Sequence, residues 1–209
     1  MTKDQFMRAA GIAPALADKW YPHVVKVMDE FGINTPLREA HFIAQIGTES
    51  NGWRSVVESL NYSVAGLAIF GDRLTAAQRE KLGRKPGELA LSPSRQADIA
   101  NIVYAGRYGN SAPGDGWKYR GRGLKQVTFR ANYADCGKAL SLDLVNDPDL
   151  LLQDQNAARS AGWFWKANNC NSFADKDDIV GLTKRINGGT NGLEDRKARY
   201  SVAKSVLVG

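Results

Sequence analysis

The spacing of apolar residues along most of the chain is that of helices. Apolar side chains recur every three or four residues, which places them on one helix face, and strand signals are weak. The pattern predicts helices at 14–31, 35–50, 63–70, 75–83, 92–106, from about 128, after 147, after 154, at 178–186 and at 193–207.

Residues that favour helix starts and stops support these boundaries. Thr2 with Gln5, and Thr75 with Gln78, have the spacing of a capping box. Gly71 is expected to end the helix before it, as glycines do at helix C-termini. The sequence therefore predicts a mainly α-helical fold.

A glycine-rich segment interrupts the helical pattern. Residues 106–123 read GRYGNSAPGDGWKYRGRG, with aromatic and basic residues between the glycines. Short β pieces are expected near 118–120 and 125–128. Long glycine-rich loops in compact domains are often functional. We therefore expect residues 1–209 to form one catalytic domain of two lobes, with this loop at the cleft and no separate wall-binding module.

The composition is that of a folded protein. Of the 209 residues 43% are hydrophobic, which is enough for a core. The longest nearly apolar run, 9–17, is shorter than the roughly 18 residues needed to span a bilayer. It also lacks a clear basic segment before it, so we expect no signal peptide and a protein made in a cytoplasm.

The net charge of +6 favours anionic partners such as phosphate-rich envelopes, acidic glycans or nucleic acid. The basic residues are scattered and show no RNA-binding or zinc-finger pattern, so nucleic acid is not the expected partner.

Cysteine and histidine are scarce. Cys136 and Cys170 leave open either one disulfide or two buried thiols. The two histidines, His23 and His41, lie in no His-Glu-x-x-His motif and no nucleophile motif. We therefore expect neither a metal site nor a Ser-His-Asp mechanism.

A carboxylic acid stands at the end of one apolar helix face. Phe42, Ile46, Glu49 and Trp53 are spaced by four, three and four residues, and Asn-Gly follows Glu49 within two positions. Partial burial and the negative end of the helix dipole both favour the protonated form of an acid placed there. Such a group suits general-acid catalysis, whereas the alternative is a solvated helix end.

Glycoside hydrolysis needs a second carboxylate opposite the first. Glu58 lies nine residues on, flanked by apolar residues, while Asp72, Glu80 and Asp115 are alternatives that the sequence alone does not separate. In the glycine-rich segment, Trp117 and Tyr119 offer flat rings to sugars or to the core.

Five motifs in order resemble glycoside hydrolase family 19, and in particular its phage endolysins. They are TESNGW, ESLNYS, YRGRGLKQVTFRANY, RINGGTNG and DRKARY, and the resemblance covers essentially the whole chain. It implies a two-lobed lysozyme-like fold, a glycosidase that acts on peptidoglycan, an inverting mechanism and no cofactor.

The resemblance also implies roles for individual residues. Glu49 takes the general-acid position, Glu58 that of the general base, and Thr128 helps to hold the attacking water. The residues matched to substrate contacts are Tyr119, Gln126, Asn132, Asn187 and Arg196, the last also suited to holding the carboxylates.

This chain departs from the family at several positions. The loop between the two acids is shorter than in plant members, which makes Glu58 a less direct match than Glu49. Ala131 stands where plant enzymes have tyrosine, and Gly47 where many members have histidine.

The resulting hypothesis is an endolysin that hydrolyses β-1,4 bonds of peptidoglycan during host lysis. We expect a monomer that does not insert into membranes, is made in the host cytoplasm and reaches the wall through a holin pore. The alternatives are a chitinase of the same family, a lytic transglycosylase and a non-catalytic sugar-binding protein.

Overall fold

The computed structural model describes all 209 residues as helices joined by loops, with three isolated β-bridges. The α-helices are α1 (Lys3–Ala10), α2 (Pro14–Glu30), α3 (Pro36–Glu49), α4 (Ala76–Leu82), α5 (Pro93–Val103), α6 (Asp115–Lys118), α7 (Arg130–Leu140), α8 (Asp154–Ala167), α9 (Asn171–Ala174), α10 (Ile179–Asn187) and α11 (Leu193–Leu207). Two 3₁₀ helices, η1 (Gly66–Arg73) and η2 (Pro148–Leu152), complete the set. The predicted mainly α fold is confirmed.

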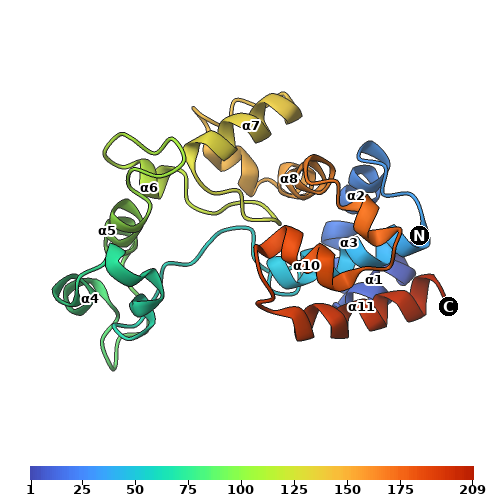
Figure 1. The fold of residues 1–209 in the computed structure, drawn as a ribbon, viewed down its shortest axis with the longest axis horizontal. Coiled ribbons are helices and arrows are strands. Elements are labelled where there is room, and N and C mark those ends of the chain that lie inside the picture. Colours follow the sequence, from blue (N-terminus) through green and yellow to red (C-terminus); the bar gives the residue numbers. More distant parts are fainter.

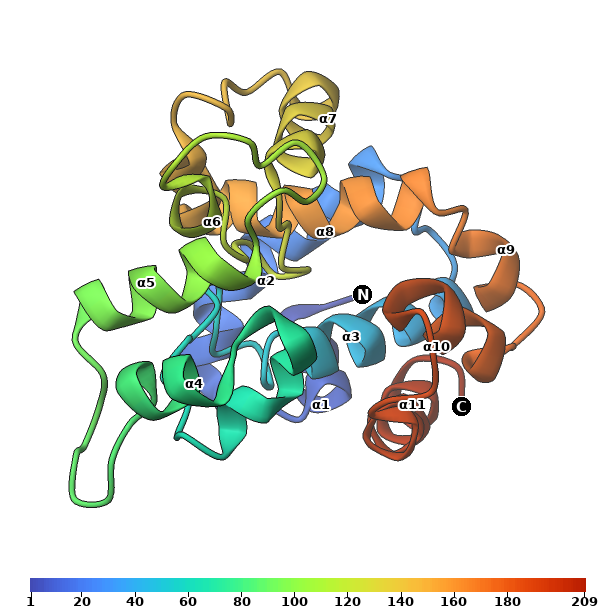
Figure 2. The ribbon, with the colours of Figure 1, turned by 60° about the vertical axis from the view of Figure 1, so that its left-hand side comes forward.

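The helices gather around separate apolar cores (Figures 1 and 2). The largest cluster holds 26 buried residues from both ends of the chain, including α1, α2, α3, α8 and α11. A second cluster of nine lies among η1, α4 and α5, and a third of seven surrounds α7. In Figure 1 the chain after α3 crosses from the large group of helices to the small one.

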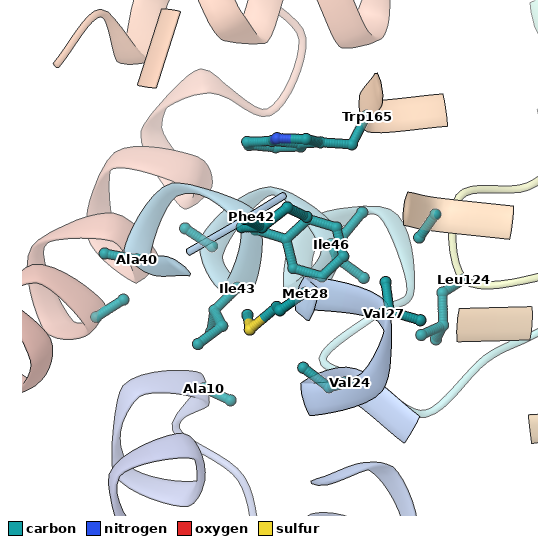
Figure 3. Packing of buried hydrophobic residues seen from close by; sticks show 14 of the residues in the cluster. Ala10, Val24, Val27, Met28, Ala40, Phe42, Ile43, Ile46, Leu124 and Trp165 are labelled. Atoms are coloured by element: carbon teal, nitrogen blue, oxygen red, sulfur yellow. The ribbon is translucent and has the colours of Figure 1, made fainter. Parts of the chain in front are cut away.

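Helix α3 runs through the large core. Figure 3 shows Phe42 and Ile46 among the buried side chains, between Trp165 of α8 and Val27 and Met28 of α2. The rings of Phe42 and Trp165 meet edge to face, with centroids 5.3 Å apart, and Phe42 and Ile46 are each 1% exposed. The apolar face predicted for this helix is therefore the buried one, and it fixes the direction in which the end of α3 points.

Local capping sets many of the predicted ends. Thr2 and Gln5 form a capping box at α1, and Thr75 and Gln78 form one at α4. After α3 the chain turns at Asn51 and Gly52, both in the left-handed region. This turn ends the helix at Glu49.

Three details differ from the sequence expectations. The short helices α6 and α9 were not predicted, and Lys118 ends α6 instead of lying in a β piece. The bridge between Arg122 and Val127 does fall at the second expected β piece, 125–128, and another bridge joins Arg122 to Val57. Helix η1 is 3₁₀ and starts at Gly66, three residues later than expected.

Both cysteines, Cys136 and Cys170, are free and buried. Burial raises the pKa of each thiol to about 12. Of the two alternatives that the sequence left open, the structure has two unreactive thiols and no disulfide.

No helix has both the length and the apolar character required to cross a bilayer.

The cations of α11 are paired within the protein. Lys197 contacts Glu194, and Arg199 contacts Asp195, both at 2.9 Å. Lys204 pairs with Asp177 at 2.5 Å. The helix packs on α3 and α1, and these three cations have acidic partners.

Candidate active site

Glu49 is the last residue of α3 and lies at the rim of the large core. Its side chain is 13% exposed, as the apolar spacing of the helix predicted. The carboxylate makes two ion pairs. Its Oε2 accepts a hydrogen bond from Lys125 Nζ at 3.0 Å, and its Oε1 accepts one from the Arg196 guanidinium. The helix end therefore delivers an acid into a cationic pocket.

Arg196 reaches Glu49 from α11 and is itself 3% exposed. Its second terminal nitrogen donates to Gln45 Oε1, one helical turn before Glu49 on α3. Gln45 is fully buried and donates in turn to Thr183 Oγ1 at 3.2 Å. The planar fork of Arg196 is thus fixed by two acceptors, in line with the expectation that it holds a carboxylate.

Glu58 lies in the crossing segment between the two groups of helices and has neutral hydrogen-bond partners. Its Oε2 accepts from the Gly121 amide at 3.0 Å, and its Oε1 accepts from the Tyr104 hydroxyl of α5. Its own amide donates to Gly121 O at 2.8 Å. Both oxygens are acceptors in this arrangement, which is the form that takes a proton from water.

Two tyrosines next to Glu58, Tyr104 and Tyr62, have raised pKa values. Burial, followed by the negative charge of Glu58, raises the pKa of Tyr104 far above its ordinary value. The same two causes raise the pKa of Tyr62. Both phenols therefore remain neutral donors over the whole range in which the protein would work.

Gly121 is the point at which Glu58 and Gln126 meet. A methyl group added to Gly121 would lie 2.6 Å from Gln126 Oε1 and 3.1 Å from Glu58 Cβ. The backbone can approach the two side chains this closely because glycine has no Cβ. Gln126 is held in the left-handed region, with φ of 59°, and donates from its amide side chain to Gly123 O at 3.0 Å.

The loop from 121 to 128 connects the two acids. Lys125 contacts Glu49, and Gln126 lies against Gly121 beside Glu58. A β-bridge joins Arg122 to Val127 across the turn. Gly123 packs on α8, where a methyl group would lie 2.3 Å from Ser160 Oγ. The loop is therefore anchored on α8 and contributes one contact to each acid.

A cavity of about 390 Å³ opens beside this loop. Thr128 and Asn132 line it, and the Asn132 amide donates to Thr128 O at 2.8 Å. The Thr128 hydroxyl donates to Gln126 O at 3.3 Å. Two aromatic residues of α8, Trp163 and Phe164, also line it. Polar groups and flat rings that converge on one hollow are typical of sugar-binding sites.

Tyr119 does not take the position predicted for it. Its ring is 2% exposed and packs against Tyr133, with centroids 5.4 Å apart, while its hydroxyl donates to Val145 O at 2.9 Å. A ring buried in this way is not available to a sugar, so the prediction of substrate contact is corrected to a packing role. Trp117 is half-buried and carries the Arg120 guanidinium 3.8 Å from its ring centroid.

Asn187 is the remaining predicted contact. It ends α10, is exposed and donates to Asn191 O at 3.4 Å. The loop that follows places Gly192 against Thr48 and Arg196. Asn187 therefore belongs to the segment next to Glu49, and no hydrogen bond joins it to either acid.

Three residues of the site were missed by sequence reasoning. Gln45 has a signal in the sequence, since it lies four residues before Glu49 on the same helix face. Lys125 and Tyr104 have none, because they meet the acids across 76 and 46 residues of chain.

Similar proteins identify the group to which this arrangement belongs. A family model described as chitinase class I matches residues 95–209. A glycosyl hydrolase family 19 domain-containing protein of Haemophilus influenzae is 38% identical over 204 residues, which cover 90% of this chain and 94% of that protein. Endochitinase 1 of Theobroma cacao is 42% identical over 71 residues, only 34% of this chain and 22% of the plant protein.

Solved structures agree on the fold. Chitinase C from Streptomyces griseus matches with a TM-score of 0.61 at 18% identity, over 99% of this chain and 76% of the other. A bacterial family 19 chitinase matches with a TM-score of 0.58 at 21% identity, over 99% of this chain and 94% of the other. With the extended match to the Haemophilus protein, these similarities show that this chain is a glycoside hydrolase and belongs to family 19.

Proposed function

We propose that this glycoside hydrolase is an endolysin that cuts β-1,4 bonds in the glycan strands of bacterial peptidoglycan by an inverting acid/base mechanism. Glu49 is the general acid, and Glu58 is the general base. The observation that carries the proposal is the different surroundings of the two carboxylates: Glu49 is held by two cations, and Glu58 by two neutral donors.

In the proposed reaction Glu49 donates its proton to the glycosidic oxygen. A water held by Glu58 and the Thr128 hydroxyl attacks the anomeric carbon from the opposite face, and Glu58 takes the proton of that water. The bond to the leaving sugar breaks as the bond to water forms, so the product has the inverted configuration. Such a mechanism requires the two carboxyl groups to be roughly 6.5–9.5 Å apart, with room for a water.

The Arg196 guanidinium beside Glu49 has a defined use in this scheme. Proton transfer leaves a carboxylate where a neutral acid stood, and the Arg196 guanidinium, already fixed by Gln45, needs no rearrangement to stabilise it. Donors that are fixed in advance toward a developing charge act mainly on the transition state.

The charge of the protein supports the bacterial wall as substrate. Peptidoglycan carries carboxylates on its stem peptides, whereas chitin is neutral. A net charge of +6 favours approach to the anionic polymer at moderate salt. In the proposed role the monomeric enzyme is made in the host cytoplasm and passes to the periplasm through a holin-type pore when lysis begins.

The experiment that tests the proposal is digestion of purified peptidoglycan by the wild type and by the Glu49→Gln and Glu58→Gln variants. Mass spectrometry of the wild-type products identifies the new reducing sugar. We expect reducing muropeptides from the wild type and at least about a 1,000-fold slower release from each variant. A Glu49→Gln variant that works as fast as the wild type would show that the acid is assigned wrongly.

The same digest separates the alternatives. A lytic transglycosylase needs one carboxylate and leaves 1,6-anhydro ends, so anhydro products would exclude a hydrolase. A chitinase would release chitin oligomers faster than it clears outer-membrane-permeabilised Gram-negative cells. A sugar-binding protein would release nothing.

A further inference from the structure

Two cations contact the proposed general acid, and they differ in how firmly they are held. Arg196 is 3% exposed and has two buried or nearly buried acceptors, Gln45 and Glu49. The Lys125 ammonium makes one hydrogen bond, 3.0 Å to Glu49 Oε2, and otherwise lies 4.5 Å from the centroid of the Phe164 ring. Of the two cations, Lys125 is the one free to exchange its partner.

The backbone of Lys125 is fixed, whereas its side chain lies on a cavity wall. The preceding residue, Leu124, is 1% exposed, and its amide donates to Ala157 O of α8 at 3.1 Å. Lys125 is the single cation among the residues that line the 390 Å³ cavity. A flexible four-carbon stem on a fixed anchor lets the ammonium move between Glu49 and the cavity.

The chemistry of Glu49 requires such a movement. A general acid must carry a proton when the glycan is bound, whereas a cation in contact with it favours the carboxylate. The contact that can be relieved is the one with Lys125. A carboxylate on a bound glycan would offer Lys125 a second anionic partner, and a neutral sugar would not.

We propose that Lys125 is a positioning residue that couples proton delivery by Glu49 to a carboxylate on the glycan. In the free enzyme Lys125 pairs with Glu49. When an anionic strand enters, Lys125 pairs with the carboxylate of the strand, and Glu49 takes up from solvent the proton that it then gives to the glycosidic oxygen. The inference rests on the proposed function and deepens it, because it predicts a preference for peptidoglycan over chitin.

Of the other charged groups around this site, Asp195 and Arg196 are held by partners of their own. Asp195 of α11 accepts from the Thr48 hydroxyl at 2.7 Å and pairs with Arg199 at 2.9 Å. Asp135 of α7, the single acidic residue on the cavity wall, is exposed. Arg196 keeps its buried acceptors. Lys125 is therefore the one charge at the acid whose position changes in this scheme.

The test compares kcat/KM across pH on three soluble glycans. They are peptidoglycan strands with stem peptides, strands freed of peptides by an amidase and so carrying a lactyl carboxylate on each muramic acid, and the neutral chitin hexamer. The proteins are the wild type, Lys125→Met, Lys125→Arg and, as a matched control, Lys166→Met, which removes an exposed lysine from the last turn of α8.

We expect Lys125→Met to lose at least about tenfold of the wild-type preference for the anionic strands over the hexamer. On the hexamer, the basic limb of its pH profile should move upward, because removing a cation that contacts the acid takes away an interaction that favours the carboxylate. Lys125→Arg should retain the preference, and Lys166→Met should match the wild type. The two kinds of strand show whether the partner is a lactyl or a stem-peptide carboxylate.

An equal slowing of Lys125→Met on all three glycans, with an unmoved basic limb, would overturn the role of Lys125 and leave the proposed function standing. A wild type that cuts the hexamer but neither kind of strand would instead overturn the proposed function. If Lys125→Met does not fold, the pH profiles of the wild type on two substrates test the coupling instead. Its basic limb should lie at higher pH on the amidase-treated strands than on the hexamer, and coincident limbs would refute the coupling.

Discussion

Gly121 gives the sharpest test of how the loop positions the proposed base. In Gly121→Ala the added methyl carbon would lie 2.6 Å from Gln126 Oε1, 3.1 Å from Glu58 Cβ and 3.3 Å from Glu58 Oε2. A methyl carbon does not approach an oxygen to 2.6 Å, since even C–H···O contacts have C···O separations of about 3.3 Å or more, so Gln126 must move by at least about half an ångström, and Glu58 must give way as well. Both neighbours belong to the site.

The expected cost falls on activity and much less on stability. A displacement of about 1 Å in a catalytic group costs about 100-fold in rate, so we expect kcat to fall about 10- to 100-fold, or about 1.4–2.8 kcal/mol in the barrier. The Gln126 amide is the far end of a flexible side chain and can turn away. Overpacking should therefore cost only about 1 kcal/mol, and the lower chain entropy of the unfolded Ala variant offsets part of it.

The assay is kcat on soluble glycan strands together with the thermal unfolding midpoint of the same samples. Gly189→Ala is the control, because its methyl group would have no neighbour within 4 Å and its backbone is not left-handed. We expect wild-type values for the control and a slow but stable Gly121→Ala enzyme. A Gly121→Ala enzyme with wild-type kcat would refute the placement of Glu58 and Gln126 at Gly121.

Three further changes test other contacts. Tyr104→Phe removes the hydroxyl donor to Glu58, a hydrogen bond to a charged group worth about 1.5–3 kcal/mol, so kcat should fall about 10- to 100-fold with the fold intact by circular dichroism. Arg196→Met should lower the free energy of unfolding in urea by about 3 kcal/mol, because it breaks a nearly buried ion pair with Glu49. Arg196→Lys should not restore activity, since one ammonium cannot replace a guanidinium fork. Burial lowers the pKa of His41, so the unfolded chain binds the proton more tightly than the folded protein does. The free energy of unfolding should therefore fall as the pH drops below about 6.5, and His41→Gln should reduce this loss. Identical pH dependence of the melting curves of the two proteins would contradict this.

The helices were predictable because their signals are local. The predicted helix at 193–207 coincides with α11, and the face carrying Phe42 and Ile46 is the buried face of α3. Spacing along one helix also placed Glu49 at the edge of the core. Capping boxes such as Thr2 with Gln5 need only residues three positions apart, and the structure forms them as predicted.

Contacts across the fold could not be predicted in the same way. Lys125 and Tyr104 reach Glu49 and Glu58 from distant parts of the chain, so no local spacing reveals them. Tyr119 was assigned to the substrate because an aromatic residue in a glycine-rich loop has the same local sequence whether its ring faces a cleft or a core. The structure buries it, and only tertiary packing decides between these positions.

The most direct test of the proposed mechanism is the anomeric form of the first product. Proton NMR recorded during digestion of soluble peptidoglycan strands resolves the anomeric signal of the new reducing sugar before it equilibrates. Attack of a water held by Glu58 on a β-linked sugar should give the α-anomer first. A β-anomer at early times, or a 1,6-anhydro sugar with no reducing end, would contradict the assignment of Glu49 and Glu58 as acid and base of an inverting hydrolase.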